Sequence, residues 1–591
     1  MYDEWGIADG YHDVAGDWHL TPPETHERLR ALLADAPAAD PLWFVDEGSN
    51  HSLLGRCLLT LEDGTDLGEL HQLPAGLPCG YHRLAPVDGG PVTLVVVAPR
   101  RCVAPKPGWG VSAQVHSLWR DTAWGIGDLR DVAELGQRVA ALGGAAVLLS
   151  PLHAPAPTQP QEASPYYPSS RRWLNPLLIP VDQPRPGSLS NDPGALIERD
   201  RVWAVKRQTF ATRFEAEAHQ SMWRSWARSQ GADLWRFATW CALADRHGPA
   251  WQQWPAELRH PDSPAVADLP IHDHEFARSA EFHAWLQWLA HNELQRTTAA
   301  AGVALIADLA VGNSPDGADA WMYQDLMALG VRIGAPPDPF NAAGQDWGLP
   351  PFIPSRLRAA HYAPFIAMVR AACAGMGGLR IDHVMGLFRQ FWVPHGGGPT
   401  DGTYVRMPAD ELLAIVRLEA SRAGAFVVGE DLGTVEMGVR EALADAGILG
   451  TKVWWFDPHP HTWPPANLAT VTTHDLPTVA GVWTGTDGSP EMQIDLRTAV
   501  PDADDMDAAS VALHARVAAA GCVLTLAAID DLAGCVDRPN LPGTVGGANW
   551  RRRMPGNTEA ILGSTPGAAI IAAIAEQSAH HALQAGQGSP S

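Results

Sequence analysis

Residues 377–384 read GGLRIDHV, residues 425–432 read AFVVGEDL and residues 468–475 read LATVTTHD. Each stretch contains a short apolar run and then an acidic residue. The three acids are, in chain order, Asp382, Glu430 and Asp475. A short apolar run bounded by turn residues is typical of a strand that is buried on both faces. The three stretches therefore predict strands that carry a carboxyl group at their C-terminal ends.

Five further apolar runs lie outside these three, and stretches of helical composition separate them. They are WGVSAQV at 109–115, AAVLLSPL at 145–152, VALIADLA at 303–310, TKVWWF at 451–456 and CVLTLAAIDDL at 522–532. Buried strands that alternate with helices indicate a parallel sheet, and eight such units indicate a (β/α)8 barrel. We therefore predict an α/β fold of the TIM-barrel type over residues 106–565.

Three segments depart from a plain barrel. Residues 1–105 contain short apolar runs between turn signals and one helical stretch, THERLRALLADA, which predicts a small β-rich accessory domain. Residues 153–300 form an insertion between the second and third strands, first Pro-rich and then helical. Its helical part repeats apolar residues at helical spacing, at Phe282, Trp285, Leu286 and Leu289. Residues 566–591 are rich in Ala and Gly, and we expect a frayed tail there.

Charge and cysteine content exclude several classes of function. The chain has 42 basic and 66 acidic residues, a formal net charge of −24, which disfavours nucleic acid and anionic membranes as partners. Seven scattered cysteines without a C-x-x-C pair indicate reduced thiols, and neither a disulfide framework nor a zinc site. The acidic N-terminus MYDEWGIADGYHD lacks the apolar core of a secretory signal. We therefore expect a cytoplasmic location, with no membrane and no nucleic acid among its partners.

The acids at the strand ends suggest a particular chemistry. In (β/α)8 enzymes the active site lies at the C-terminal face of the barrel, where strand ends and the following loops meet. Three acids there, in a chain with 24 Trp, favour chemistry at a glycosidic bond, which needs one ionised and one protonated carboxyl group. Arg380 lies two residues before Asp382, so both side chains point to one face of the strand. A guanidinium there would keep Asp382 ionised.

These stretches resemble the catalytic motifs of amylomaltases and disproportionating enzymes, glycoside hydrolase family 77. The resemblance extends through linked motifs over residues 106–560. They are HSLWRDTAWGIGDLRD, SPYYPSSRRWLNPL, IADLAVGNSPDGADAW, GAPPDPFNAAGQDWGLPPF, LRIDHVMGLFRQFWVP, VVGEDLGTV, TTHDLPT and NWRRRMP. The first 105 residues resemble the additional domain of longer bacterial members. The resemblance implies a 4-α-glucanotransferase that moves segments of α-1,4-glucans to glucose or to other glucans.

The same resemblance implies a role for each acid. Asp382 would be the nucleophile that forms a covalent glucosyl-enzyme, and Glu430 would act first as acid and then as base. Asp475 would hold hydroxyl groups of the reacting sugar. His474 and Arg380 would complete its surroundings.

Further residues are expected to contact substrate or to support the site. Tyr166 matches a tyrosine that stacks on the sugar at the cleavage point, and Trp347 lies on a Gly-flanked segment that we interpret as a loop over the acceptor sugars. Asp338 and Gln345, on the same segment, are expected to contact glucan hydroxyls. Asp308, at the end of the third strand, matches the first barrel motif, and structural support is an equal alternative for it. We expect no cofactor and no metal.

The acids alone leave three outcomes open. A glucosyl-enzyme can be attacked by a glucan hydroxyl, which gives transfer, or by water, which gives hydrolysis. The choice of transfer rests on the resemblance and on loops that would exclude water. A barrel that binds glucans without turnover is the third possibility, and the complete set of acids argues against it.

Overall fold

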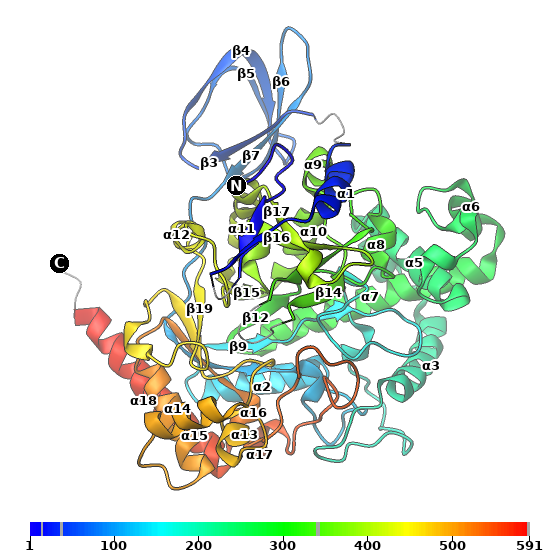
Figure 1. Ribbon diagram of the computed structural model, residues 1–591. Helices are drawn as coiled ribbons and strands as arrows, with labels where there is room; N and C mark the ends of the chain where they lie inside the picture. The colour runs from blue at the N-terminus through cyan, green and yellow to red at the C-terminus, as the bar shows by residue number, and fades with distance from the viewer. Residues whose placement is uncertain (14–15, 36–39, 338–342, 588–591) are drawn as a thin grey trace. The chain divides into compact units, whose positions relative to one another are not determined.

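Eight strands form one parallel sheet that curls into a nearly closed barrel (Figure 1). The computed structural model describes residues 1–13, 16–35, 40–337 and 343–587. The strand order is β18-β15-β12-β9-β8-β21-β20-β19. The strand bounds are β8 Gly108–Ala113, β9 Ala146–Leu149, β12 Ala304–Leu309, β15 Gly378–Ile381, β18 Phe426–Gly429, β19 Gly450–Val453, β20 Asn467–Thr470 and β21 Leu524–Ala528. All eight predicted strands are therefore present, and the predicted fold class is confirmed.

Four of the barrel strands are buried along their whole length. Every residue of β15, β18, β20 and β21 is buried. Close packing in this sheet also requires glycine, because a Cβ on Gly110 would lie 2.1 Å from the carbonyl oxygen of Ala146 on β9. Burial on both faces explains why these strands are recognisable as continuous apolar runs in the sequence.

The chain divides into two compact units. Unit 1 comprises Met1–Ala104, Tyr323–Ala374 and Ile381–Ile448, and unit 2 comprises Pro105–Met322, Gly375–Arg380 and Leu449–Ser591. The N-terminal block, which we expected to form an accessory domain of its own, thus belongs to the same compact unit as two later segments.

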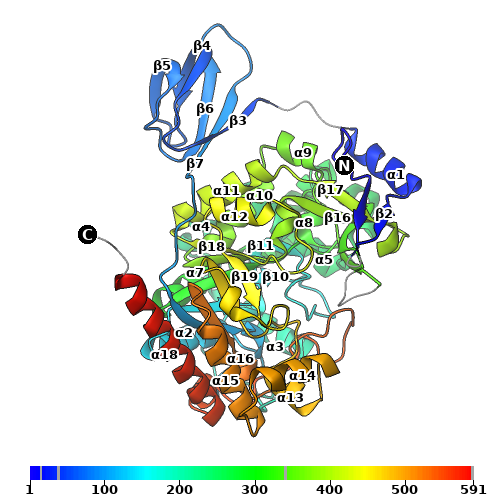
Figure 2. The ribbon, with the colours of Figure 1, turned by 60° about the vertical axis from the view of Figure 1, so that its left-hand side comes forward.

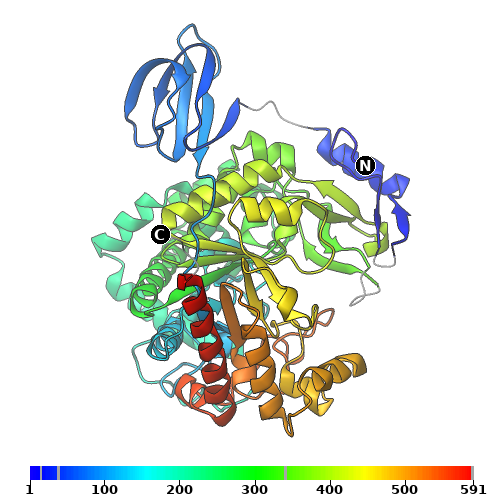
Figure 3. The ribbon, with the colours of Figure 1, turned by 90° about the vertical axis from the view of Figure 1, so that its left-hand side faces the viewer.

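The N-terminal block of unit 1 contains a twisted five-stranded sheet in the order β3-β7-β6-β4-β5 (Figure 3). Its strands are β3 Leu42–Asp46, β4 His51–Thr60, β5 Asp66–Leu73, β6 Gly80–Pro86 and β7 Thr93–Ala98. Val96 and Ala98 of β7 pack against Ala414 and Leu418 of α11, Ala409–Ala423. This apolar contact explains why the block and α11 fall in one unit.

Unit 1 has a second sheet, in the order β14-β13-β16-β17, and a short hairpin, β1-β2. Its remaining elements are β1 Gly10–His12, β2 Trp18–Leu20, β13 Val331–Ala335, β14 Gln345–Leu349, β16 Arg389–Pro394, β17 Thr403–Arg406, α1 Pro23–Leu33, α9 Pro354–Ala359, α10 Ala363–Cys373, α12 Val439–Asp445 and the 3-10 turns Val384–Leu387 and Pro399–Asp401. Leu29 and Leu33 of α1, the predicted N-terminal helix, pack with Trp392 and Val405 of the sheet.

The insertion of unit 2 lies between β9 and β12, as predicted. It contains β10 His153–Ala154, β11 Ser170–Leu174, α3 Arg199–Glu217, α4 Ser221–Ser229, α5 Ala232–His247, α6 Pro264–His272, α7 His274–Ala300 and the 3-10 turns Pro176–Leu178, Trp251–Gln253 and Ala256–Leu258. The four apolar residues at helical spacing all lie on α7 and are buried. Their role in core packing is therefore confirmed.

The C-terminal part of unit 2 differs from the sequence expectation. Residues Thr565–Gln587 form a helix, α18, and the expected frayed tail from residue 566 is wrong for this stretch. Ile570, Ile571 and Ile574 are at most 5% exposed. The helix lies beside α15, Met506–Ala518 (Figure 2). Ala-rich sequence favours a helix once a neighbouring helix buries its isoleucines, which composition alone does not reveal.

The other elements of unit 2 are short or follow the barrel strands. They are α2 Leu129–Ala141, α8 Ala318–Met322, α13 Val479–Thr484, α14 Pro490–Ala499, α16 Ile529–Leu532, α17 Thr558–Leu562 and the 3-10 turns Val115–Ser117 and Pro460–Thr462.

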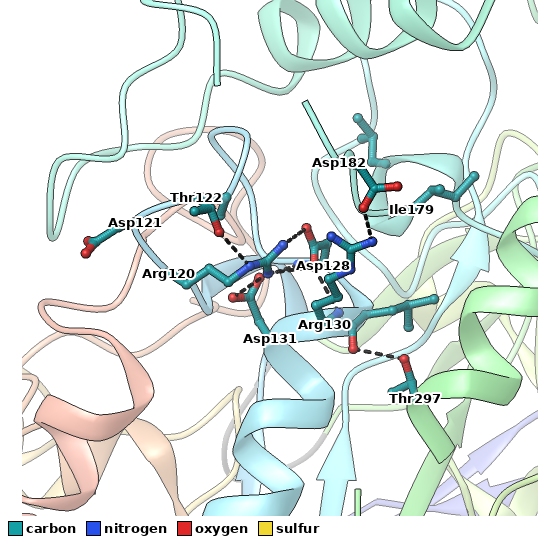
Figure 4. Close-up of polar contacts among 12 residues, drawn as sticks. Arg120, Asp121, Thr122, Asp128, Arg130, Asp131, Ile179, Asp182 and Thr297 are labelled. Atoms are coloured by element: carbon teal, nitrogen blue, oxygen red, sulfur yellow. Dashed lines mark hydrogen bonds and ion pairs between the residues drawn. The ribbon is translucent and has the colours of Figure 1, made fainter. Parts of the chain in front are cut away.

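A buried ionic cluster anchors the start of α2 (Figure 4). Asp128 caps the helix by accepting from the backbone N–H of Arg130 at 2.9 Å, and Asp131 accepts from the backbone N–H of Asp128 at 2.8 Å. The Arg120 guanidinium donates to both Asp128 oxygens at 2.8 and 2.9 Å. The Asp128 side chain is 2% exposed, so its charge depends on these partners.

Asp128→Ala should lower the free energy of unfolding by about 3 kcal/mol, because it removes a helix cap and leaves Arg120 with one carboxylate instead of two. Urea denaturation measures this change. Asp182→Ala is the matched control, because Asp182 pairs with Arg130 of the same cluster but is 75% exposed. It should cost less than about 1 kcal/mol. Equal losses for the two variants would contradict the importance of the buried pair.

Candidate active site

Asp382 and Glu430 occupy equivalent places in unit 1, each directly after a barrel strand. Asp382 follows β15 and Glu430 follows β18, and the backbone N–H of Glu430 donates to the carbonyl oxygen of Ile381 at 3.0 Å. The two strands are neighbours in the sheet. The two acids thus leave the sheet side by side at its C-terminal edge.

The turn after Asp382 holds the Glu430 side chain. Its Oε2 accepts from the backbone N–H of His383 at 2.9 Å, and its Oε1 accepts from the backbone N–H of Leu432 at 2.7 Å. His383 has a φ of 46°, in the left-handed region, and its N–H faces Glu430. A Cβ on Gly429 would lie 2.8 Å from Val384, so glycine permits this close approach. Both Glu430 oxygens are therefore oriented by backbone donors.

The His383 side chain, which the sequence analysis did not single out, links this turn to Trp347. Burial lowers the pKa of His383 to about 4, with the charge of Arg389 acting in the same direction and that of Asp382 against it. The Trp347 ring meets the His383 ring edge-on, with centroids 5.1 Å apart. Beside Asp382 the protein thus places a neutral imidazole that packs against an aromatic ring.

The segment around Trp347 is a strand and not the loop that we expected. Trp347 and Gln345 both lie on β14, which pairs with β13, and the Trp347 Nε1 donates to the Gln345 Oε1 at 3.1 Å. The flanking glycine suggested a loop, but the segment forms a strand because it pairs with β13, which lies elsewhere in the sequence. Asp338 lies outside the described residues.

Unit 2 brings Arg380, Asp308 and Tyr166 together. Arg380 on β15 and Asp308 on β12 are 7% and 4% exposed, and Arg380 Nη1 donates to the two Asp308 oxygens at 2.6 and 2.7 Å. The Tyr166 hydroxyl donates to Asp308 Oδ2 at 2.5 Å. Asp308 thus supports both a buried cation and the tyrosine expected to stack on the sugar.

The same network continues to Asp475 through His474. The rings of Tyr166 and His474 stack with centroids 4.6 Å apart, and the tyrosine hydroxyl lies 3.3 Å from His474 Nδ1. His474 Nε2 lies 3.3 Å from Asp475 Oδ2, and the Asn540 amide donates to Asp475 Oδ1 at 2.6 Å. All four residues belong to unit 2.

The surroundings of Asp475 favour its ionised form. Removal from water acts to raise its pKa, but the charge and hydrogen bond of His474, the amide of Asn540 and the charge of Arg380 outweigh it and lower the pKa. Asp475 is therefore an acceptor at neutral pH, which suits a group that holds sugar hydroxyls.

Two further residues of this network escaped the sequence analysis as individual residues. Trp550 is 5% exposed and adopts a φ of 58°, which is strained for a bulky side chain. Its ring lies 5.4 Å from that of Tyr166 and 5.1 Å from that of His474. Asn540 meets Asp475 across 65 positions of sequence. The motif NWRRRMP contains Trp550, but no sequence pattern near Trp550 or Asn540 predicts that Trp550 packs against Tyr166 and His474 or that Asn540 binds Asp475.

The described residues show no group of three or more His, Cys, Asp or Glu side chains that could hold a metal ion. Nor does the described part of the chain contain a helix with the length and apolar character that a membrane crossing requires. All seven cysteines are free.

Known proteins resemble this chain over most of its length. Residues 113–559 match the family model Glyco_hydro_77, described as 4-alpha-glucanotransferase. A 4-alpha-glucanotransferase of Mycobacterium tuberculosis (strain ATCC 25618 / H37Rv) is 43% identical over 473 residues, which are 72% of this chain and 65% of that protein. One of Haemophilus influenzae is 34% identical over 501 residues, which are 76% of this chain and 70% of that protein. The chain thus spans 65% of the length of the mycobacterial relative.

Solved structures agree with these sequence matches. The amylomaltase from Corynebacterium glutamicum superposes with a TM-score of 0.82 at 28% identity, covering 97% of this chain and 98% of that one. The amylomaltase from Streptococcus agalactiae, solved in complex with acarbose, has the same fold, with a TM-score of 0.70 at 20% identity over 80% of this chain and 99% of that one. By its sequence match over residues 113–559 and its barrel, the chain belongs to glycoside hydrolase family 77, the 4-alpha-glucanotransferase family.

Proposed function

We propose that this protein is a 4-α-glucanotransferase that disproportionates α-1,4-glucans by a retaining double displacement. The observation that carries the proposal is the placement of Asp382 and Glu430 directly after the neighbouring strands β15 and β18. Neighbouring strands lie about 4.7–4.9 Å apart. That spacing favours the separation of about 5–5.5 Å between the carboxyl groups of a retaining enzyme over the 6.5–9.5 Å of an inverting one.

In this mechanism each acid has one role per step. The Asp382 carboxylate attacks the anomeric carbon while Glu430 gives its proton to the leaving glycosidic oxygen. The bond to the leaving glucan breaks and a covalent glucosyl-enzyme forms. Glu430, now ionised, takes the proton from the 4-hydroxyl of an acceptor, which displaces Asp382 from the sugar. Backbone donors on both Glu430 oxygens keep the group in one orientation through both steps.

We assign the residues of unit 2 to the reacting sugar. Asp475, as an ionised acceptor, would hold its hydroxyls and support positive charge as it develops in the transition state. Tyr166 would stack on its ring, with the hydroxyl fixed by Asp308 and the ring backed by His474. Arg380, through its ion pair with Asp308, would hold in place β15, the strand that leads to Asp382. Asp308 fits the supporting role, since its oxygens accept from Arg380 and Tyr166.

We assign acceptor binding to Trp347, Gln345 and Asp338. Trp347 packs against His383, next to the proposed nucleophile, and Gln345 orients the indole through its Nε1. An aromatic ring at this position would favour a sugar over water as the second substrate, because it stacks on the apolar face of a pyranose.

The substrates would be maltooligosaccharides, fragments of starch or glycogen, and glucose. An acidic chain is compatible with neutral glucans and disfavours nucleic acid. Free cysteines support the cytoplasm as the compartment, since thiols stay reduced there.

Incubation with maltotriose alone should yield glucose together with a ladder of longer maltooligosaccharides. Transfer conserves the number of reducing ends, whereas hydrolysis increases it. Chromatography of the products and a reducing-end assay on the same sample distinguish the two. A steady rise in reducing ends without longer products would mean an α-glucan hydrolase, and glucan binding without any products would mean a non-catalytic barrel.

Asp382→Asn should abolish transfer, because the amide cannot form the covalent intermediate. Glu430→Gln should lower turnover of maltotriose by about 10²–10⁴-fold. With α-glucosyl fluoride, whose leaving group needs no proton, the Glu430→Gln protein should still form the glucosyl-enzyme, which mass spectrometry detects on Asp382. Asp410→Asn, on the exposed start of α11, is the matched control and should keep full activity. Activity in Asp382→Asn would overturn the assignment.

A further inference from the structure

The segment after α16 returns to the turn that follows β20 and contacts two successive residues there, His474 and Asp475. The backbone N–H of Asn540 donates to the carbonyl oxygen of His474 at 3.0 Å. The Asn540 side chain donates to Asp475 Oδ1 at 2.6 Å. Arg538 Nη1 donates to the carbonyl oxygen of Asp475 at 2.8 Å. One short segment thus contacts both the backbone and the carboxylate at this position.

Arg538 anchors this segment to Asp487. Its guanidinium forms two hydrogen bonds to Asp487, from Nε at 2.7 Å and from Nη2 at 2.6 Å, and its side chain is 14% exposed. A bidentate pair of this kind is strong and fixes geometry. Since Arg538 also binds the Asp475 carbonyl oxygen, the backbone that carries Asp475 is held independently of the Asn540 side chain.

The Asn540 side chain is not needed to close its own loop. That task falls to Asn549, whose amide donates to the carbonyl oxygens of Leu541 and Thr544 at 3.2 Å and to the Thr544 hydroxyl at 2.9 Å. The Asn549 oxygen also accepts from the backbone N–H of Leu541 at 3.1 Å. The hydrogen bond that the Asn540 amide makes to Asp475 therefore serves the carboxylate.

We propose that Asn540 is a positioning residue for the reaction, which acts by fixing the rotation of the Asp475 carboxylate. A carboxylate turns easily about its last bond, and it can meet sugar hydroxyls only when its lone pairs point toward them. Asn540 occupies Oδ1 and His474 faces Oδ2, so the plane of the group is set before substrate binds. Because carboxylates only accept, the Asn540 nitrogen must be the donor. The inference rests on the proposed function of Asp475.

Charged and titratable groups near Asp475 affect how a new carboxyl group beside it would titrate. His474 and Arg380 are charged or titratable groups that lower the pKa of Asp475, and Asn540 does so as a neutral hydrogen-bond donor. Asp530, in α16, has a pKa raised to about 7 by burial and by the charge of Asp531, and the charge of His474 acts to lower that pKa. Replacing Asn540 by an isosteric acid therefore adds one titratable group in contact with Asp475.

The activity of Asn540→Asp relative to that of the wild type should depend on pH. Two carboxyl groups in contact share one proton, and the pKa of the pair is raised. While that proton is bound, the acid donates to the other carboxylate as the amide did. As pH rises through the raised pKa, both groups ionise and repel, so the orientation of Asp475 is lost. The ratio of variant to wild-type kcat on maltotriose should therefore fall steadily as pH increases.

Asn540→Ala should lower kcat by roughly 10- to 100-fold at every pH, because the hydrogen bond to a charged group is lost without replacement. KM should change less than kcat if the carboxylate acts mainly in the transition state. This variant also keeps the inference testable if Asn540→Asp fails to fold, which circular dichroism detects.

Val545→Asp is the matched control, because it places a new carboxylate in the same loop away from Asp475, at a fully exposed side chain. The ratio of its kcat to that of the wild type should not change with pH. A falling ratio in this control, an unchanged ratio in Asn540→Asp, or kcat within twofold of wild type in Asn540→Ala would each overturn the inference.

A direct measurement separates this inference from the proposed function. In protein labelled with ¹³C at aspartate carboxyl carbons, the signal lost in Asp475→Asn reports the titration of Asp475. Asn540→Ala should raise the pKa of that carboxylate, because a donor to its ionised form is removed. An unshifted titration would overturn the inference whatever the activity. Failure of the wild type to act on maltotriose, with the pKa shift present, would overturn only the proposed function.

Discussion

The buried ion pair between Arg380 and Asp308 is the interaction on which the arrangement of unit 2 depends. Both side chains are almost fully removed from water, so neither charge could remain without the other. The pair joins β12 to β15, and Asp308 also fixes the Tyr166 hydroxyl. Because Asp382 follows Arg380 by two residues, the strand that leads to the proposed nucleophile is anchored by the same contact.

Two residues in turns, His383 in unit 1 and Trp550 in unit 2, adopt strained backbone conformations. Both are non-glycine residues in the left-handed region. His383 directs its N–H to Glu430, and Trp550 packs its ring against Tyr166 and His474. Such conformations cost of order 1–3 kcal/mol and persist only when the surrounding contacts compensate. Burial of Trp550 and the hydrogen bond from His383 to Glu430 are compensating contacts of this kind.

Within each unit, the surroundings of the candidate residues set the protonation state of these residues. Burial keeps the His383 imidazole neutral beside Asp382, whereas His474, Asn540 and Arg380 keep Asp475 ionised against the effect of burial. A neutral ring beside the proposed nucleophile avoids a competing cation, and an ionised acceptor suits a group that is proposed to hold sugar hydroxyls. The chain as a whole is strongly acidic, so these local partners, and not the net charge, decide each state.

The sequence by itself determined the eight barrel strands, the family and the positions of Asp382 and Glu430 directly after their strands, because each depends on a run of a few adjacent residues; Asp475 lies five residues beyond β20 and not at its end. The sequence did not reveal that Trp347 lies in a strand, that residues 565–587 form a helix, or that Asn540 and Trp550 contact the site. Only the tertiary structure decided these features. Strand pairing, burial against α15 and side-chain contacts across 65 positions depend on which distant segments meet, and no local pattern contains that information.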